Sequence, residues 1–206
     1  MFLFYRKRFD KNGIDPDGFS CHEDISKITF TTKNDLRENY PYGLFAVPLR
    51  EVVRIHTSAG TTGMPIVVGY TRNDLKIWTE LVARILTSGG ITKDDVIQIA
   101  FNYELFTGAF GFHYGAEKIG ASVIPVSIEN PKKHIKILQD YKTSALISTP
   151  SYALQIANAL TEMDINPNSL SLRFGLFGEE PWSERMRQEI EKNLRLQLQI
   201  TTDLQK

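Results

Sequence analysis

Strand-like and helix-like segments alternate along most of this sequence, and this alternation constrains the fold more than any other feature. Short runs rich in β-branched and aromatic residues predict strands, and apolar residues at helical spacing predict helices. The expected strands are residues 95–101, 122–126, 145–148 and 172–177, and the expected helices are residues 107–119, 134–141, 152–163 and 183–194. Repeated strand–helix–strand units predict the α/β class, with a mostly parallel sheet covered by helices. Ligands of such sheets bind beyond the carboxyl ends of the strands.

The part of the chain before this alternation changes character at about residue 50. Apolar residues recur at helical spacing over Leu75–Leu86, with Thr71 or Asp74 as the expected cap and the Gly89–Gly90 pair as the expected end. Residues 1–50 instead scatter their apolar side chains among charges and turns. We expect them to form an irregular N-terminal segment that packs onto the main sheet.

The composition excludes several classes of protein. The 206 residues carry 24 Lys and Arg against 24 Asp and Glu, and this balance argues against a nucleic-acid partner. Cys21 is the single cysteine, which excludes an intrachain disulfide and favours a reducing compartment. The apolar start is followed at once by Arg6, Lys7 and Arg8, unlike a signal peptide, and no apolar run approaches the ~18 residues that cross a bilayer. We therefore expect a cytoplasmic protein without membrane attachment.

A loop of glycines and hydroxyl residues lies between two β-branched runs, Val52–Ile55 and Ile66–Val68. Its sequence from His56 to Pro65 is HTSAGTTGMP. Glycines let backbone N–H groups approach an anion closely, and hydroxyls add donors that suit phosphate oxygens. The loop is not a Walker A motif, because Met and Pro follow the last glycine instead of Lys and Ser or Thr. We interpret it as a phosphate clamp, and an ordinary turn is the alternative.

Several ordered motifs carry a family resemblance over nearly all of residues 4–195. Residues 57–65 resemble the phosphate-loop signature of the adenylate-forming acyl-CoA synthetase superfamily. Similarity to the phenylacetate–coenzyme A ligase family extends over residues 39–48, 106–117, 149–153 and 177–182. The resemblance implies that residues 51–195 are part of an ATP-binding (AMP-binding, adenylation) domain. It also implies a two-step reaction, in which an aryl-acetate carboxylate attacks the α-phosphate of ATP and the coenzyme A thiol then displaces AMP.

The resemblance also assigns the site residues. The β- and γ-phosphates would be held by Ser58, Gly60, Thr61, Thr62 and Gly63. Adenine would be lined by Gly178, Glu179, Glu180 and Pro181, and the aromatic acid by Tyr103, Phe106, Gly108 and Ala109. Core packing is the alternative for the pocket residues. Two positions depart from the family pattern: Met64 stands where many relatives have Lys, and Glu179 replaces a small residue.

The implied substrates and cofactors are ATP, coenzyme A and Mg²⁺, and the implied partners are small molecules, with a homodimer possible in full-length relatives. No catalytic residue is assigned, because the catalytic Lys of the family belongs to a C-terminal domain that this sequence does not contain. The histidines lack metal-ligand spacing, and we expect His113 to be packed or hydrogen-bonded and Glu117 to be structural.

The two ends of the chain depart from the family. The motif of the type Asp-Xaa-Tyr-Gly-Leu-Thr-Glu should follow Leu194, but residues 196–206 differ from it. Suitable codons for these residues, read in the neighbouring frame, encode Ala-Thr-Asp-Asn-Tyr-Gly-Leu-Thr-Glu, so we interpret the tail as an out-of-frame reading of a longer gene. The start also lacks a helical segment found in relatives. We therefore expect a fragment that is poorly soluble or partly folded and has little ligase activity alone.

Two further hypotheses remain open from the sequence. The chain could derive from another aryl-acid CoA ligase, because one sequence does not reveal the specificity of the pocket. It could also be a non-catalytic nucleotide-binding module or gene remnant.

Overall fold

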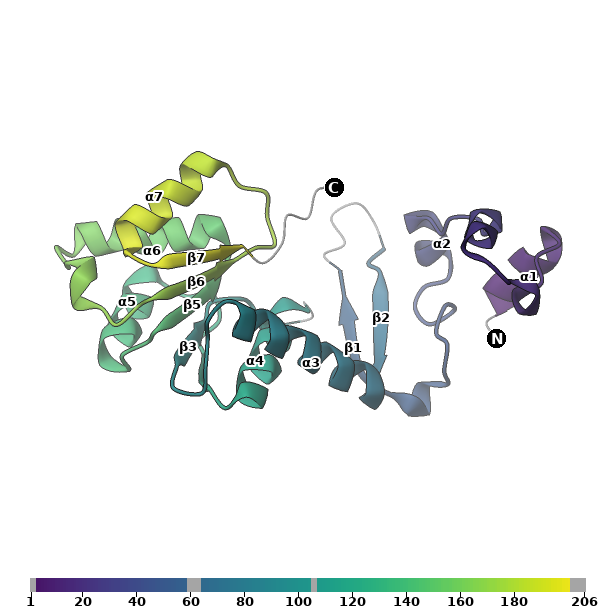
Figure 1. Cartoon of the computed structure of the whole chain (residues 1–206), viewed down its shortest axis with the longest axis horizontal. Helices are drawn as coiled ribbons and strands as arrows, with labels where there is room; N and C mark the ends of the chain where they lie inside the picture. The colour runs from purple at the N-terminus through teal and green to yellow at the C-terminus, as the bar shows by residue number, and fades with distance from the viewer. Residues whose placement is uncertain (1–2, 59–63, 105–106, 201–206) are drawn as a thin grey trace. The chain divides into compact units, whose positions relative to one another are not determined.

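The computed structural model describes residues 3–58, 64–104 and 107–200 (Figure 1). The chain forms two compact units, residues 1–75 and residues 76–206. The larger unit holds a parallel sheet, and the smaller unit holds a two-stranded antiparallel hairpin.

Five parallel strands form the sheet of the larger unit. They are β3 (Val96–Ile99), β4 (Ser122–Pro125), β5 (Ala145–Ser148), β6 (Phe174–Phe177) and β7 (Gln197–Ile200). The connecting segments contain helices α4 (Gly108–Ile119), α5 (Pro131–Asp140), α6 (Pro150–Glu162) and α7 (Glu184–Leu194), and the short 3₁₀ helix η4 (Pro167–Ser169). The predicted α/β class is confirmed, and β7 continues the alternation beyond the helix with which the sequence pattern ended.

The strand order reverses at β3. The strands lie in the order β4-β3-β5-β6-β7, so the chain passes from β3 to β4 on one side and then builds β5, β6 and β7 on the other. The reversal therefore lies between β3 and β5, which pair in parallel with Ile97 opposite Ala145. Ligands of open α/β sheets bind outside the carboxyl ends of the strands at such a reversal. A ligand site is therefore expected at the carboxyl ends of β3 and β5.

Helices cover both faces of this sheet, as Figure 1 shows. One buried cluster joins the sheet to α5, α6 and α7 through residues such as Ile135, Ile156 and Ile190. The other joins it to α4 and to α3 (Arg72–Ser88). The period of two along a strand sorts the side chains, because Leu176 belongs to the α3–α4 cluster and its neighbour Phe177 to the opposite one. Both faces are buried, as expected for a parallel sheet.

Local capping sets where the helices begin. The Thr71 hydroxyl accepts a hydrogen bond from the backbone N–H of Asp74 (3.2 Å), and the Asp74 carboxylate accepts one from the N–H of Thr71 (2.8 Å). Both residues expected as caps thus cap α3 together, in a capping box. The helix ends at Ser88, just before the expected Gly89–Gly90 pair, and Gly90 has a φ of +86°. A left-handed residue of this kind is a common helix terminator.

The smaller unit contains more helix than the sequence predicts. Residues 1–50, expected to be irregular, include α1 (Leu3–Lys11), α2 (Lys33–Glu38) and the 3₁₀ helices η1 (Pro16–Gly18) and η2 (His22–Lys27) and most of η3 (Leu49–Glu51). A capping box explains α2, because Thr32 and Asp35 exchange side-chain to backbone hydrogen bonds at its start. The hairpin pairs β1 (Val52–Thr57) with β2 (Val67–Thr71).

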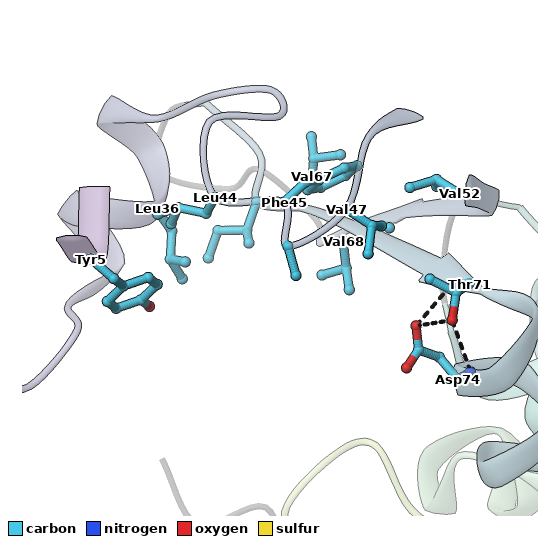
Figure 2. Close-up of a pocket in the computed structure, with 13 residues that line it drawn as sticks. Tyr5, Leu36, Leu44, Phe45, Val47, Val52, Val67, Val68, Thr71 and Asp74 are labelled. Atoms are coloured by element: carbon cyan, nitrogen blue, oxygen red, sulfur yellow. Dashed lines mark hydrogen bonds between the residues drawn. The ribbon is translucent and has the colours of Figure 1, made fainter. Parts of the chain in front are cut away.

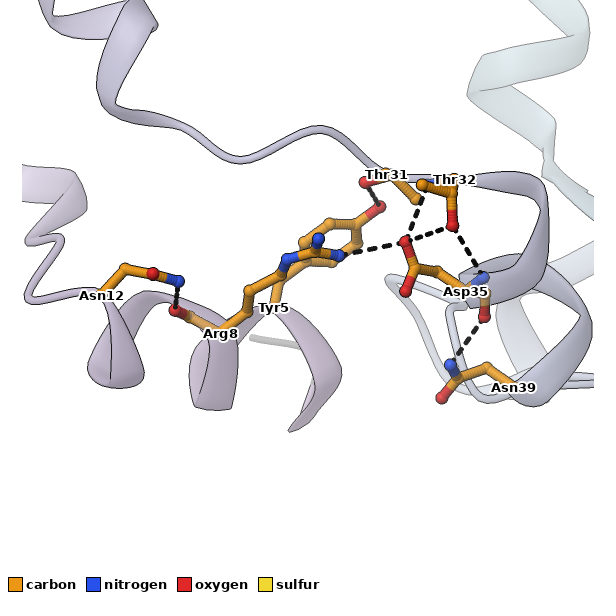
Figure 3. A network of polar contacts seen from close by, with 7 residues as sticks. All are labelled: Tyr5, Arg8, Asn12, Thr31, Thr32, Asp35 and Asn39. Atoms are coloured by element: carbon orange, nitrogen blue, oxygen red, sulfur yellow. Dashed lines mark hydrogen bonds and ion pairs between the residues drawn. The ribbon is translucent and has the colours of Figure 1, made fainter.

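Polar contacts join α1 to the start of α2 (Figure 3). The Arg8 guanidinium lies 3.1 Å from the Asp35 carboxylate, and the Tyr5 hydroxyl lies 3.0 Å from that of Thr31. Hydrogen bonds from Thr32 and Arg8 hold the pKa of Asp35 below its usual value, so the carboxylate that caps α2 stays charged. Contacts between residues about 27 positions apart are invisible to local patterns, which explains why the sequence did not predict this order.

Candidate functional site

Two hydrogen bonds between Ser58 and Ile66 close the base of the hairpin loop. The N–H of Ser58 donates to the carbonyl of Ile66 (2.9 Å), and the N–H of Ile66 donates to the Ser58 hydroxyl oxygen (3.1 Å). The Ser58 hydroxyl therefore fixes the ends of the loop while its own proton remains able to donate to an anion. Gly60, Thr61, Thr62 and Gly63 lie outside the described residues, so their assignment to phosphate remains a prediction.

An apolar pocket of about 550 Å³ lies within the smaller unit (Figure 2). Phe45, Val47, Val52 and Val67 contribute apolar walls. Asp74, a charged residue at its edge, is already engaged in the capping box of α3. Sequence reasoning did not predict this pocket, because its walls come from β1, β2 and segments before them that share no local pattern.

Three loops meet at the carboxyl edge of the parallel sheet in the larger unit. Tyr103 follows β3, Thr149 follows β5 and Gly178 follows β6. The N–H of Gly178 donates to the carbonyl of Ser148 (3.3 Å), which continues the β5–β6 pairing beyond the strands. The expected adenine segment and the expected acid-pocket segment therefore lie at the same edge, next to the reversal of strand order.

Tyr103 is held by α4 on two sides. Its ring meets Phe110 edge-to-face at 5.3 Å between centroids, and its hydroxyl oxygen lies 3.2 Å from Nδ1 of His113. Burial raises the pKa of the Tyr103 hydroxyl well above its usual value, and the charge of Glu117 adds to the effect. The expectation of a hydrogen-bonded His113 is confirmed. Phe106, the other aromatic pocket candidate, lies outside the described residues.

The small pocket candidates occupy the first turn of α4. Ala109 is fully buried in the cluster between α3, α4 and the sheet. Gly108 lies directly against the carboxylate of Glu179, and any side chain on Gly108 would overlap Oε1 of that glutamate. The structure thus brings one residue of the acid-pocket set into contact with one of the adenine set.

Glu179 adopts an unusual conformation at this junction. Its φ is +72°, in the left-handed region that favours glycine. Burial of the carboxyl end raises the pKa of Glu179, although the residue as a whole stays exposed. In the described part of the chain, no hydrogen bond or ion pair engages this carboxylate. The departure from the family noted in the sequence therefore places a weakly compensated carboxylate between the two predicted subsites.

Glu180 has a different role. Its carboxylate accepts a hydrogen bond of 2.5 Å from the N–H of Ser151, in the first turn of α6, whose N-cap is Thr149. A carboxylate at a helix N-terminus is stabilised by the free N–H groups and the helix dipole. Glu180 thus fixes the loop after β6 to the loop after β5. Sequence reasoning missed this contact, since the two residues are 29 positions apart.

The last residues of the adenine segment lead into the core. Trp182, which follows Pro181, meets Phe177 edge-to-face at 6.4 Å and packs on the cluster under α6 and α7. The segment Gly178–Pro181 is therefore anchored at both ends. Within the described part of the chain, no group of three or more His, Cys, Asp or Glu side chains is placed to bind a metal ion. Nor does any described helix have the length and apolar character to cross a membrane.

Comparison with known proteins identifies relatives along almost the whole chain. No protein-family model matches. The chain is 48% identical over 190 residues to a phenylacetate-coenzyme A ligase of Pseudomonas putida, and 47% identical over 191 residues to one of Escherichia coli K12. These alignments cover 92% of this chain and 43–44% of the relatives. The chain thus spans less than half the length of the curated relatives that it matches.

Comparison with solved structures also finds CoA ligases. A 2-hydroxyisobutyryl-CoA ligase in complex with 2-HIB-AMP matches 98% of this chain and 44% of its own, with a TM-score of 0.89 and 26% identity. A long-chain-fatty-acid-CoA ligase from Archaeoglobus fulgidus matches 74% of this chain with a TM-score of 0.60 at 19% identity, a likeness of fold alone.

The fold, the motifs at the edge of the sheet and these comparisons agree: the chain is similar to the adenylate-forming CoA ligases. Within that class, the four curated relatives at 45–48% identity are all phenylacetate-coenzyme A ligases, and the chain matches 42–44% of the length of each. The resemblance found in the sequence is therefore confirmed.

Proposed function

We propose that this chain provides the ATP-binding and aryl-acid-binding part of an AMP-forming phenylacetate–coenzyme A ligase. In the full reaction, an aryl-acetate carboxylate attacks the α-phosphate of ATP, pyrophosphate leaves, and the coenzyme A thiol displaces AMP from the acyl-adenylate. The observation that carries the proposal is the 48% identity to a named phenylacetate-coenzyme A ligase over 92% of the chain. The solved relatives contain an acyl-AMP and CoA, which supports ATP and coenzyme A as substrates.

The proposed roles follow the three segments of the site. Ser58 and the loop residues Gly60, Thr61, Thr62 and Gly63 hold the phosphates, with the closed base of the hairpin in support. Gly178–Pro181 lines the adenine, supported by its position at the carboxyl edge of β6. Tyr103, Phe106, Gly108 and Ala109 form the acid pocket. Residues 51–195 are accordingly proposed as part of the adenylation domain.

Three other parts of the proposal do not rest on the site. A homodimer and a requirement for Mg²⁺ rest on the family alone, and a cytoplasmic location rests on the sequence features given above. The described residues offer no cluster of metal ligands, so none of them is assigned to the ion. Phosphoryl transfer depends mainly on positioning the reactants and stabilising charge. The loops at the described edge of the sheet can position the reactants.

Calorimetric titration of ATP into the purified chain tests the proposed phosphate clamp. A double variant, Thr61→Ala with Thr62→Ala, should bind ATP about tenfold or more weakly, because each lost hydroxyl removes a hydrogen bond to a charged oxygen. Thr161→Ala in α6 is the matched control and should bind as the unchanged chain does. Phenylacetate-dependent release of pyrophosphate then reports whether the chain also performs the first step. Absence of ATP binding, or a double variant that binds normally, would contradict the proposal.

A further inference from the structure

Three side chains form a continuous polar line beside the candidate acid pocket. The Tyr103 hydroxyl oxygen lies 3.2 Å from Nδ1 of His113, and Nε2 of the same ring lies 3.2 Å from Oε1 of Glu117. His113 and Glu117 are four residues apart on α4, so they lie on one face of the helix. The line runs inward from the exposed Glu117, through the mostly buried His113, to Tyr103.

The charges along this line decide which atom carries each proton. A neutral imidazole has one N–H donor and one acceptor nitrogen. The negative carboxylate of Glu117 favours the proton on Nε2, the nitrogen that it faces. Nδ1 is then the acceptor, and the Tyr103 hydroxyl must donate the hydrogen bond to Nδ1 of His113.

Packing fixes the ring of Tyr103 as well. It meets Phe110 at an interplanar angle of 84° and His113 at 89°, both edge-to-face. Edge-to-face pairs of this kind favour one ring orientation. With the ring and the hydroxyl proton both directed by α4, the oxygen offers only lone pairs to anything on its free side.

We infer that His113 and Glu117 are positioning residues that make the Tyr103 hydroxyl a hydrogen-bond acceptor toward the aryl-acid pocket. Tyr103 then does not donate to the carboxylate of the acid, which must be held elsewhere. It instead discriminates in favour of aryl acids whose ring carries a hydroxyl donor. The existence of the pocket rests on the proposed function, but the direction of the hydrogen bond does not.

Imidazole NMR tests the proton positions directly in the full chain. With ¹⁵N-labelled histidine, two-bond spectra at about pH 7.5 should show His113 as the neutral Nε2–H tautomer. His113→Gln assigns the signals by their loss. Glu117→Gln should raise the population of the Nδ1–H tautomer, whereas the control Glu162→Gln, on the exposed end of α6, should leave the spectrum unchanged. An imidazolium or an Nδ1–H tautomer in the unchanged chain, or an insensitive Glu117→Gln variant, would overturn the inference.

Ligand binding tests the consequence. Phenylacetate and its 3- and 4-hydroxy forms are titrated into the chain and into Tyr103→Phe. The variant should lose about two- to tenfold in affinity for a hydroxylated acid while binding phenylacetate almost unchanged, as expected for one lost hydrogen bond. An equal loss for all the acids would show that Tyr103 donates to the carboxylate, and no loss for any would remove it from recognition. If no aryl acid binds the unchanged chain, the proposed function fails, while the NMR result still decides the hydrogen-bond direction.

Discussion

Replacing Asp95 by Asn should destabilise the larger unit by far more than the loss of a surface charge does. Asp95 is 1% exposed, just before β3. One oxygen accepts from the Ser144 hydroxyl (2.6 Å) and the Arg173 guanidinium (2.6 Å), and the other accepts from the backbone N–H of Thr92 (2.8 Å). The carboxylate therefore ties together the starts of three neighbouring strands, β3, β5 and β6.

The magnitude follows from what each partner loses. Asn keeps the shape, but its NH₂ group must face one of the donors, and a buried donor left unpaired costs about 1–3 kcal/mol. The Arg173 side chain is 60% exposed and can be rehydrated, so the lost ion pair adds only about 0–1 kcal/mol. Together the two contributions give an expected loss of about 1–4 kcal/mol. For a chain of this size each kcal/mol lowers the melting temperature by about 2–4 °C.

Urea unfolding of the variant checks this value, with Asp94→Asn as a matched control one residue away. Asp94 is exposed, and it contacts the Thr92 hydroxyl through its backbone N–H, which the substitution keeps. The control should therefore stay within about 0.5 kcal/mol of the unchanged chain. Burial alone would raise the pKa of Asp95, but hydrogen bonds from Ser144 and Thr92 and the ion pair with Arg173 together hold it below 3.8. The stabilisation is therefore present above that pH and lost as the pH falls through the lowered pKa. Equal stabilities of the two variants at neutral pH would refute the reasoning.

Two further changes test the protonation of His134 and the backbone conformation of Glu179. Burial lowers the pKa of His134 below its usual value of 6.5, so the unfolded chain binds a proton more readily and the stability contributed by neutral His134 is lost as the pH falls below 6.5. The difference in unfolding free energy between the unchanged chain and His134→Asn should therefore shrink between about pH 7.5 and 5.5. A constant difference would contradict this. Glu179 has a φ of +72°, so Glu179→Gly should stabilise the chain by about 0.5–1 kcal/mol in the same urea assay, because left-handed backbone costs an L-residue more than glycine loses in entropy. Glu179→Ala, which keeps the backbone strain, should gain less, and an equal gain would assign the effect to the carboxylate instead.

The alternation of strands and helices could be predicted because its causes are local. A strand such as Ala145–Ser148 is a short apolar run, and α6 begins with Thr149 as its cap and Pro150 in its first turn. Such signals lie within a few residues of the element that they define. Family motifs gave the candidate site in the same way, as contiguous stretches of sequence.

Local sequence signals did not predict the helices of the smaller unit. Helices α1 and α2 are short, and contacts such as Arg8 with Asp35 accompany them. Short helices gain most of their stability from tertiary contacts rather than from propensity. Scattered apolar residues among charges therefore gave no periodic signal.

The sequence by itself determined the α/β class, the order of its elements and the segments that carry the candidate site. The tertiary structure alone decided which side chains meet: Glu180 with the start of α6, Glu179 with Gly108, and Asp95 with Arg173, 78 positions away. Propensity and capping act over one or two turns of chain, whereas these contacts exist only once the sheet has brought distant loops to a common edge. The direction of the Tyr103 hydrogen bond depends on such a contact too. Tyr103, in the loop after β3, reaches His113 only when α4 packs beside the strand.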